Sequence, residues 1–333
     1  IAFAWILDVV ADVPKWAGCL IAGGVMTVYF AAGGLLTSAW VNLVQLAVLL
    51  IGFAIALPWA LSAAGGWSAV VAAAPQEPDY FGFWQSGRSG IVYMALLVPA
   101  FLISPGLIQK VYGARDEKTV RLGVGLAAVA LLLFAAVPPL LGIVAHAFAP
   151  DLANHELALP AVLTLGLPPA IGAIGLAAVF SAEVSSADAI LFMLSTSLSE
   201  DLYKRFVRPE ASDRQVLLVA RWAAVLGGGA AVALALGLPS VIGALSVFYT
   251  LLGVSLFVPL VVGLHSRKPV VPEAIAAIGA GVAVALAAKL AGISGDYAWY
   301  ATWLGIFASA TIFGIVFAVR GMKRQSGSRG NRS

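Results

Sequence analysis

The sequence predicts an all-α polytopic membrane protein. Hydrophobic residues make up 61% of the 333 residues and charged residues only 11%, and the mean hydropathy is +0.99, far above the soluble range. Apolar runs long enough to cross a hydrocarbon core of about 30 Å recur along the chain. The runs are apolar on every side, whereas the strands of a membrane barrel alternate in polarity. We therefore expect the spans to be helices.

The chain is expected to contain nine full spans after the end of an earlier helix. Ile1–Val10 reads as the last turns of a helix already under way, and Asp8, Asp12 and Pro14 are expected to form the loop that follows. No initiator Met or signal peptide precedes them, so we interpret the sequence as a fragment without its N-terminal helices. The predicted full spans are Ala17–Ala32, Val41–Leu61, Ile91–Ile108, Leu122–Ala145, Pro168–Leu198, Trp222–Leu238, Val241–Leu264, Ala274–Ala288 and Ala298–Val319.

The basic residues gather at alternate connections between the predicted spans. If the helices alternate in direction, all but three of the 19 Lys and Arg residues lie on one side, and the exceptions are Lys15, Arg88 and Lys289. The positive-inside rule then places the C-terminus in the cytoplasm of a cell whose inner (plasma) membrane holds the protein. We expect a transmembrane domain over residues 1–320 and a basic cytoplasmic tail over residues 321–333. The other predicted cytoplasmic groups are Lys110–Arg121, Lys204–Arg221 and the pair Arg267 and Lys268.

Several classes of function are excluded by motif. The sequence has no Walker A motif, Gly-rich nucleotide fingerprint, HExxH or Ser-His-Asp arrangement, so neither an enzyme nor ATP-driven transport is expected. His146, His155 and His265 are too dispersed for a metal site, and no cofactor is expected. The small positive net charge follows the membrane topology, so it does not indicate a nucleic-acid partner. The single cysteine, Cys19, excludes an intrachain disulfide.

Residues 181–188 place hydroxyls and carboxylates in the middle of an apolar span. Polar groups at bilayer depth cost free energy and are usually turned inward for a task such as holding an ion. Ala182, Ser185, Ser186 and Ala189 follow the i, i+3, i+4, i+7 spacing and share one helix face. Two hydroxyls beside two small residues offer hard oxygen ligands to a small cation. Alternatively, the serines hydrogen-bond their own i−4 carbonyls and the small residues only pack.

A second informative segment is Pro99–Lys110, where Pro105 and Gly106 break an apolar span near its centre. Broken spans are tolerated where the freed backbone groups face protein, water or substrate, and they commonly form transporter binding sites. The alternative is a structural kink in an ordinary helix bundle.

Three segments resemble motifs of the sodium:solute symporter family. Tyr29–Gln45 is similar to the Tyr-x-x-x-Gly-Gly…Trp-Thr-Asp-x-x-Gln signature of that family, and Gln109–Lys118 to its Gln-Arg-x-x-Ala-Ala-(Lys/Arg)-(Asp/Ser) segment. Ala182–Asp188 with Ser199–Lys204 resembles its Ala-x-x-Ser-(Ser/Thr)-x-(Asp/Ser)…Asp-(Ile/Leu)-Tyr-(Lys/Arg) stretch. The motifs occur in the order of the family, and the resemblance covers nearly the whole chain.

This resemblance implies a LeuT-like fold of two inverted five-helix repeats with extra C-terminal helices, the first repeat being incomplete. It implies a secondary active transporter that moves Na⁺ and a small polar organic solute together across the lipid bilayer by alternating access. One alternative is a proton-coupled symporter of the same fold, with Glu183 or Asp188 as the proton carrier. Another is a transporter-like sensor domain of a signalling protein, although the tail after Arg320 leaves no room for a kinase domain.

The resemblance carries a sodium site onto the backbone carbonyl of Ala182 and the hydroxyls of Ser185 and Ser186. Its other ligands would come from the first core helix, which is not in this sequence. Sodium is a hard cation, and neutral oxygens at a helix crossing suit it.

A second ion site is implied less directly. Some relatives use an Asp of the fifth core helix, and Asn42 stands at that position here. Asp188 lies one turn beyond Ser185 and could supply a carboxylate from the opposite side, or it could pair with a neighbouring polar group. Glu183 points roughly away from the serines, which makes it a poor direct ligand.

Solute contacts are expected from the broken helix and from the span that faces it. Hydroxyls inside packed membrane helices also serve as interhelical hydrogen bonds, which is the alternative for the facing span. The residues expected along the solute path are Phe101, Ser104, Pro105, Gly106, Ser246, Tyr249 and Thr250.

Overall fold

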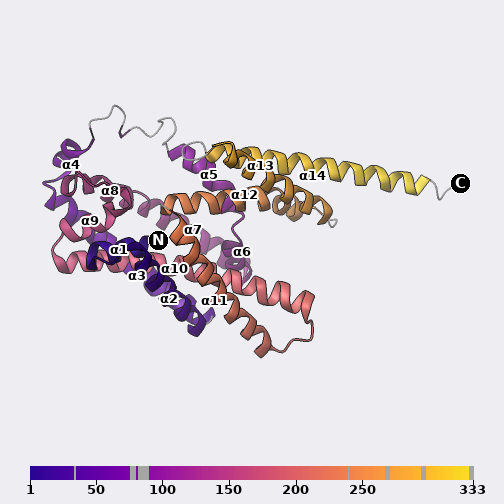
Figure 1. Ribbon diagram of the computed structural model, residues 1–333, viewed down its shortest axis with the longest axis horizontal. Helices are drawn as coiled ribbons and strands as arrows, with labels where there is room; N and C mark the ends of the chain where they lie inside the picture. Colours follow the sequence, from indigo (N-terminus) through magenta and orange to yellow (C-terminus); the bar gives the residue numbers. More distant parts are fainter. Residues whose placement is uncertain are drawn as a thin grey trace. The chain divides into compact units, whose positions relative to one another are not determined.

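All regular elements of the described residues are helices in the computed structural model (Figure 1). Seven of these helices are long and apolar enough to cross a membrane, or up to nine if each of two bent helix pairs counts as one span. Arg88, Arg267 and Lys268 lie outside the described residues, as does the end of the predicted tail. The structure describes residues 1–33, 35–75, 80–81, 90–238, 240–266, 271–293 and 298–329.

The chain divides into two compact units. Unit 1 comprises Ile1–Gln76 and Gln109–Val241, and unit 2 comprises Glu77–Ile108 and Ile242–Ser333. The helix α6 (Pro105–Tyr112) contains the boundary at residue 108.

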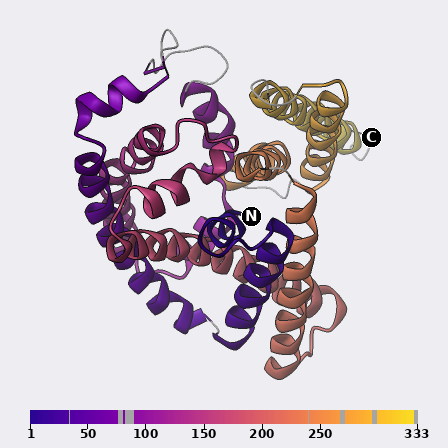
Figure 2. The same ribbon diagram turned by 60° about the vertical axis from the view of Figure 1, so that its left-hand side comes forward.

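Unit 1 begins with two helices joined by a sharp turn. The axes of α1 (Ala2–Ala11) and α2 (Lys15–Gly33) differ by 120°, and both helices are drawn in indigo in Figure 2. Asp12 ends α1 in the left-handed conformation, with φ 51°. The expected helix end and loop are therefore present, but Asp8 was wrongly placed in the loop. It lies inside α1, where its carbonyl accepts a hydrogen bond from the Asp12 N–H at 2.9 Å.

Among the described residues of unit 1, the most extensive packing is between α3 (Leu35–Ala63) and α10 (Pro169–Thr196). Proline occupies the first helical position of α10, where its missing N–H costs nothing. A π-helix, η2 (Ser197–Val207), continues α10, and a capping box of Ser212 and Gln215 starts the next helix. The remaining helices of unit 1 are α4 (Trp67–Ala73), α7 (Glu117–Phe134), α8 (Val137–Phe148), η1 (His155–Leu157), α9 (Ala158–Leu165) and α11 (Asp213–Gly237).

One apolar core joins the C-terminal half of α3 to the start of α10. Phe53 and Ala56 of α3 pack with Leu141 of α8 and with Leu163 and Leu167, which come shortly before α10. The buried side chains of α10 recur every three or four residues, as expected of a helix that presents one face to its neighbours. This core fixes the antiparallel pairing of α3 and α10.

Unit 2 is built from α5 (Gly90–Leu102), α12 (Val241–His265), α13 (Val271–Leu290) and α14 (Ala298–Arg329), with α13 and α14 side by side in orange and yellow in Figure 1. Gly281 and Gly305 allow these two helices to approach closely, because a methyl group on Gly281 would lie 3.2 Å from the Gly305 carbonyl oxygen. Arg320 of α14 binds both carboxylate oxygens of Glu273, at 2.8 and 2.7 Å. The indole of Trp303 donates to the carbonyl of Ala95 and ties α14 to α5 at 3.1 Å.

Candidate ion and solute sites

The predicted sodium ligands lie together on the middle of α10. The Ser186 hydroxyl donates to the Ala182 carbonyl at 3.0 Å, so the i−4 hydrogen bond that was the alternative reading is present. This bond uses the hydroxyl proton and leaves lone pairs on both oxygens, which can still accept a cation. Ser186 is exposed and Ser185 is partly exposed, whereas Ser181 and Val184 of the same helix are buried. The hydroxyls therefore lie at the edge of the buried face of α10.

The contact at Gly52 sets the axial register between α3 and α10. A methyl group built on Gly52 would lie 2.6 Å from the Cβ of Ala178 and 3.0 Å from the carbonyl oxygen of Ile174, so the backbones meet here. Gln45 precedes Gly52 by seven residues and Ser185 follows Ala178 by seven, a rise of about 10.5 Å along each antiparallel helix. Gln45 and Ser185 therefore lie at one level of the contact.

The same count gives the axial level of the possible second-site residues. Asn42 precedes Gly52 by ten residues and Asp188 follows Ala178 by ten, which places them at one level, about one turn from Ser185. Asp188 is 4% exposed, although it lies within a membrane-spanning helix. Carboxylates at such depth are rare and usually functional.

Two further residues, on α2 and α3, were not assigned a role from the sequence. Oε1 of Gln45 is buried and has no hydrogen-bond partner among the described residues. The phenol of Tyr29, on α2, interacts electrostatically with Asp188. Both residues belong to the signature segment Tyr29–Gln45, so the motif was the available signal, but only the helix register shows which side chains it brings to α10.

Glu183 contacts a different helix. Its carboxylate accepts a hydrogen bond from the backbone of Phe3 in α1, and the rings of Phe3 and Phe180 lie 5.0 Å apart. Glu183 is therefore directed toward α1, in keeping with its predicted direction away from the serines. Among the described residues, no three His, Cys, Asp or Glu side chains gather as a metal site.

The predicted break in the third full span, Ile91–Ile108, is present between α5 and α6, whose axes differ by 41°. The carbonyl of Ser104 accepts hydrogen bonds from the N–H groups of Leu107 and Ile108, both at 3.0 Å, and so begins α6. Pro105 is the first residue of α6, where it needs no hydrogen-bond acceptor. Among the described residues, a methyl group built on Gly106 would meet only the hydroxyl of Ser104, at 4.0 Å.

The other predicted solute contacts divide between two environments in unit 2. The rings of Phe101 and Tyr249 lie 6.1 Å apart, so the structure brings these two together. The hydroxyl of Thr250 lies 3.0 Å from that of Thr302 in α14, which is the interhelical bond considered as the alternative. Ser246 is partly exposed on α12. A cavity of about 450 Å³ beside α5 is lined almost entirely by apolar side chains, namely those of Tyr93, Met94, Leu97, Val98, Phe101, Leu102 and Leu107 with Gly90.

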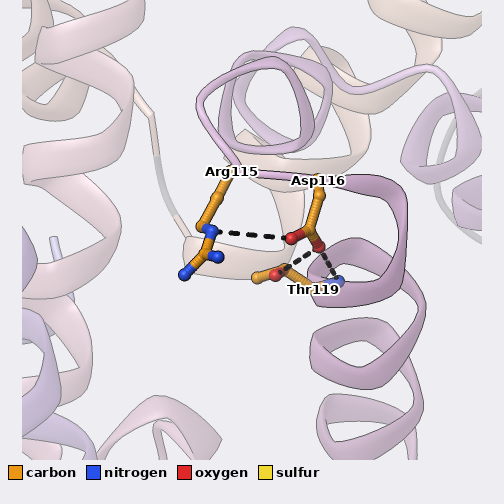
Figure 3. A network of polar contacts seen from close by, with 3 residues as sticks. All are labelled: Arg115, Asp116 and Thr119. Carbon is orange, nitrogen blue, oxygen red and sulfur yellow. Dashed lines mark hydrogen bonds and ion pairs between the residues drawn. The ribbon is translucent and has the colours of Figure 1, made fainter.

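The motif segment after the break forms an ordered helix start (Figure 3). One oxygen of Asp116 accepts from both the hydroxyl and the N–H of Thr119, each at 2.7 Å, and Arg115 Nε lies 3.7 Å from the other oxygen. These hydrogen bonds, the Thr119 hydroxyl first, hold the pKa of Asp116 below its usual value. Asp116 is thus the N-cap of α7.

Comparison with known proteins identifies the family. The family model described as "Sodium:solute symporter family" matches residues 1–281. The chain belongs to this family. Among its members, the chain is 27% identical to the high-affinity choline transporter 1 of Drosophila melanogaster over 79% of this chain and 44% of that protein. It is 31% identical to the sodium/pantothenate symporter of Escherichia coli (strain K12), over 65% of this chain and 46% of that protein.

The fold agrees with that of a symporter of known structure. A substrate-bound, outward-open Na⁺-coupled sialic acid symporter matches 96% of this chain and 70% of its own, with a TM-score of 0.74 and 19% identity. The predicted LeuT-like helical fold is therefore confirmed. The chain spans a little under half the length of the choline transporter and pantothenate symporter that it matches.

Proposed function

We propose that the natural polypeptide carrying this chain is a secondary active transporter, which couples inward sodium movement to a small polar organic solute by alternating access. The observation that carries the proposal is a group of polar residues at similar heights along the packed helices α3 and α10. In a member of a sodium symporter family, this group combines the hydroxyl of Ser185 with the amide of Gln45 and, one turn away, Asn42 and Asp188. Oxygen-rich surroundings inside an apolar protein suit a hard cation.

The sodium ligands proposed on this chain are the Ala182 carbonyl and the hydroxyls of Ser185 and Ser186. Asn42 and Asp188 form a proposed second ion site. One sodium that moves down about 100 mV and a tenfold gradient releases about 3.7 kcal/mol, enough for about 500-fold accumulation of a neutral solute. A second ion would roughly square this ratio, so the occupancy of the Asp188 site decides the concentrating power.

The solute path is proposed to involve the broken helix from Phe101 through Ser104, Pro105 and Gly106, with Ser246, Tyr249 and Thr250 of α12. The bend at the break and the exposed ring of Phe101 support this proposal. The family relatives suggest the first solutes to test. They include transporters named for choline, pantothenate and iodide.

The test is uptake into proteoliposomes with an imposed sodium gradient, using labelled choline, pantothenate, iodide and sialic acid as probes. We expect sodium-dependent uptake of at least one probe, and its loss in Ser185→Ala and Ser186→Ala. Ser195→Ala is the matched control, because it removes a hydroxyl on the same helix that bonds its own backbone, to the Phe192 carbonyl at 3.0 Å. Intact sodium-dependent uptake in the first two variants would show that the ligand assignment is wrong. Uptake driven by a pH gradient without sodium would show a proton-coupled symporter instead.

A further inference from the structure

A set of polar contacts holds both sides of the connection between α11 and α12, away from the proposed ion and solute residues. Nζ of Lys15 donates to the carbonyl of Leu238, just after α11, at 2.7 Å. Oε1 of Glu156 accepts from the backbone N–H of Val241, the first residue of α12, also at 2.7 Å. A cation thus lies at the negative end of one helix and an anion at the positive end of the next, as the helix dipoles favour.

Trp5 of α1 joins the two contacts. Its indole N–H donates to Oε2 of Glu156 at 2.9 Å, and Nζ of Lys15 lies 5.4 Å from the centre of its ring. Both carboxylate oxygens of Glu156 are therefore bonded, to donors 151 and 85 residues away in the sequence. The Asn154 side chain accepts from the N–H of Glu156 at 3.1 Å and fixes the start of η1. Trp5, Lys15 and Glu156 are called the clasp below.

The clasp differs from the ion pair of Glu273 and Arg320 in unit 2. Glu273 has a side chain that is 3% exposed, so separating it from Arg320 would leave a charge in an apolar interior. The bonds of the clasp are only partly buried, and Glu156 belongs to a three-residue helix between longer ones. Water can replace such bonds, so the clasp can open locally while the surrounding helices stay folded.

We propose that the clasp positions the first turn of α12 during transport. Trp5, Lys15 and Glu156 act as positioning residues and do not bind the ion or the solute. Val241 is the last residue of unit 1, and the chain enters unit 2 at the next residue. All the contacts of the clasp described above therefore lie within unit 1, at the end of its last segment. The role in transport rests on the proposed function, whereas the clasp itself can be measured without transport.

The structural test is hydrogen exchange at the Val241 amide in the membrane-reconstituted protein. This N–H is at a helix start and has no acceptor within the helix, so its protection depends on Glu156. We expect Glu156→Ala to speed its exchange about tenfold or more, because the lost bond is to a charged group. Trp5→Phe, which keeps the ring but removes one bond to Glu156, should have a smaller effect. Asp151→Asn is the control, since it neutralises an exposed acid of the same loop. Unchanged exchange in Glu156→Ala overturns the clasp.

The functional test is ²²Na⁺ uptake into proteoliposomes under a negative-inside potential, with choline, pantothenate, iodide and sialic acid each supplied outside as the solute probe. We expect Glu156→Ala to lower the maximal rate per molecule about threefold or more while the half-saturating sodium concentration changes less than about twofold, as for a residue that touches no ligand. If Glu156→Ala folds poorly, Glu156→Gln is measured in its place. Its side chain keeps the volume of Glu156 and one hydrogen-bond acceptor, so it should retain more activity than Glu156→Ala. Equal rates for Glu156→Ala and Asp151→Asn overturn the role of the clasp in transport. Absence of sodium uptake in the wild type would instead contradict the proposed function, and the exchange measurement would still decide the clasp.

Discussion

Asp116 decides where α7 begins. Its carboxylate accepts hydrogen bonds from the hydroxyl and the backbone N–H of Thr119, two donors that an exposed helix start would otherwise leave to water. The charged form of the carboxyl is the better acceptor, which is why its pKa lies below the usual value. The stabilisation is therefore fully present above the unfolded pKa of about 3.9 and is lost as the pH falls through the lower, folded pKa.

Asp116→Asn should remove this pH dependence and keep the helix start, because Asn is also a good N-cap. We expect the amides at the start of α7 to exchange faster in the wild type as the pH falls below about 4, relative to the variant. Hydrogen exchange of residues 118–121 across this pH range measures the difference. Thr119→Val removes only the hydroxyl donor, so it should move the Asp116 pKa back toward its usual value. An unchanged pKa in Thr119→Val would show that the hydroxyl is not its main cause.

At the scale of elements, the α3–α10 contact depends on one missing side chain. Gly52 lets the backbone of α3 approach Ala178 and the Ile174 carbonyl, and this approach sets the register that aligns Asn42 with Asp188. The core of Phe53 and its neighbours holds the same pair of helices farther along the contact. Packing at the glycine and in the core therefore positions polar residues that lie two to three turns away.

Gly52→Ala should destabilise this contact by about 1–3 kcal/mol, because the new methyl group overlaps Ala178. The double variant Gly52→Ala with Ala178→Gly should recover part of the loss. Gly24→Ala is the control, since no atom of the part of the chain that the structure describes lies within 4 Å of a methyl group at that position. Thermal unfolding of the purified protein measures all three. Equal midpoints for Gly52→Ala and Gly24→Ala would contradict the close approach.

At the scale of the whole molecule, the distribution of charge predicts how the protein sits in the membrane. The positive-inside rule places the connection after η2 in the cytoplasm and the loop before α9 outside. In a Cys19→Ser background, Glu210→Cys and Asp151→Cys place single thiols at exposed positions in these two connections. We expect a membrane-impermeant maleimide to label intact cells only at position 151, and position 210 only after the membrane is opened. The reverse pattern would invert the proposed topology.

The sequence predicted the features that depend on local composition. Apolar runs predicted the spans, and Pro105 and Gly106 predicted the break between α5 and α6. The serine cluster of α10 was found from helix spacing alone. The alignment of Asn42 with Asp188 could not be found that way, because it depends on a backbone contact between Gly52 and Ala178. Glu156 was also missed, since its partners are distant in sequence and a lone acid in a loop has no distinctive pattern.

The register of α3 and α10 also has a mechanical consequence. Sliding one helix past the other by a single turn, about 5.4 Å, would remove Ala178 from the notch at Gly52 and separate the levels of Asn42 and Asp188. Packed helices resist such shear because their side chains interlock. We therefore expect the two helices to rotate or tilt together. The ligand oxygens on α3 and α10 would then keep the same relative positions throughout a transport cycle. Release of a cation held between these helices would require another helix to move away from the site.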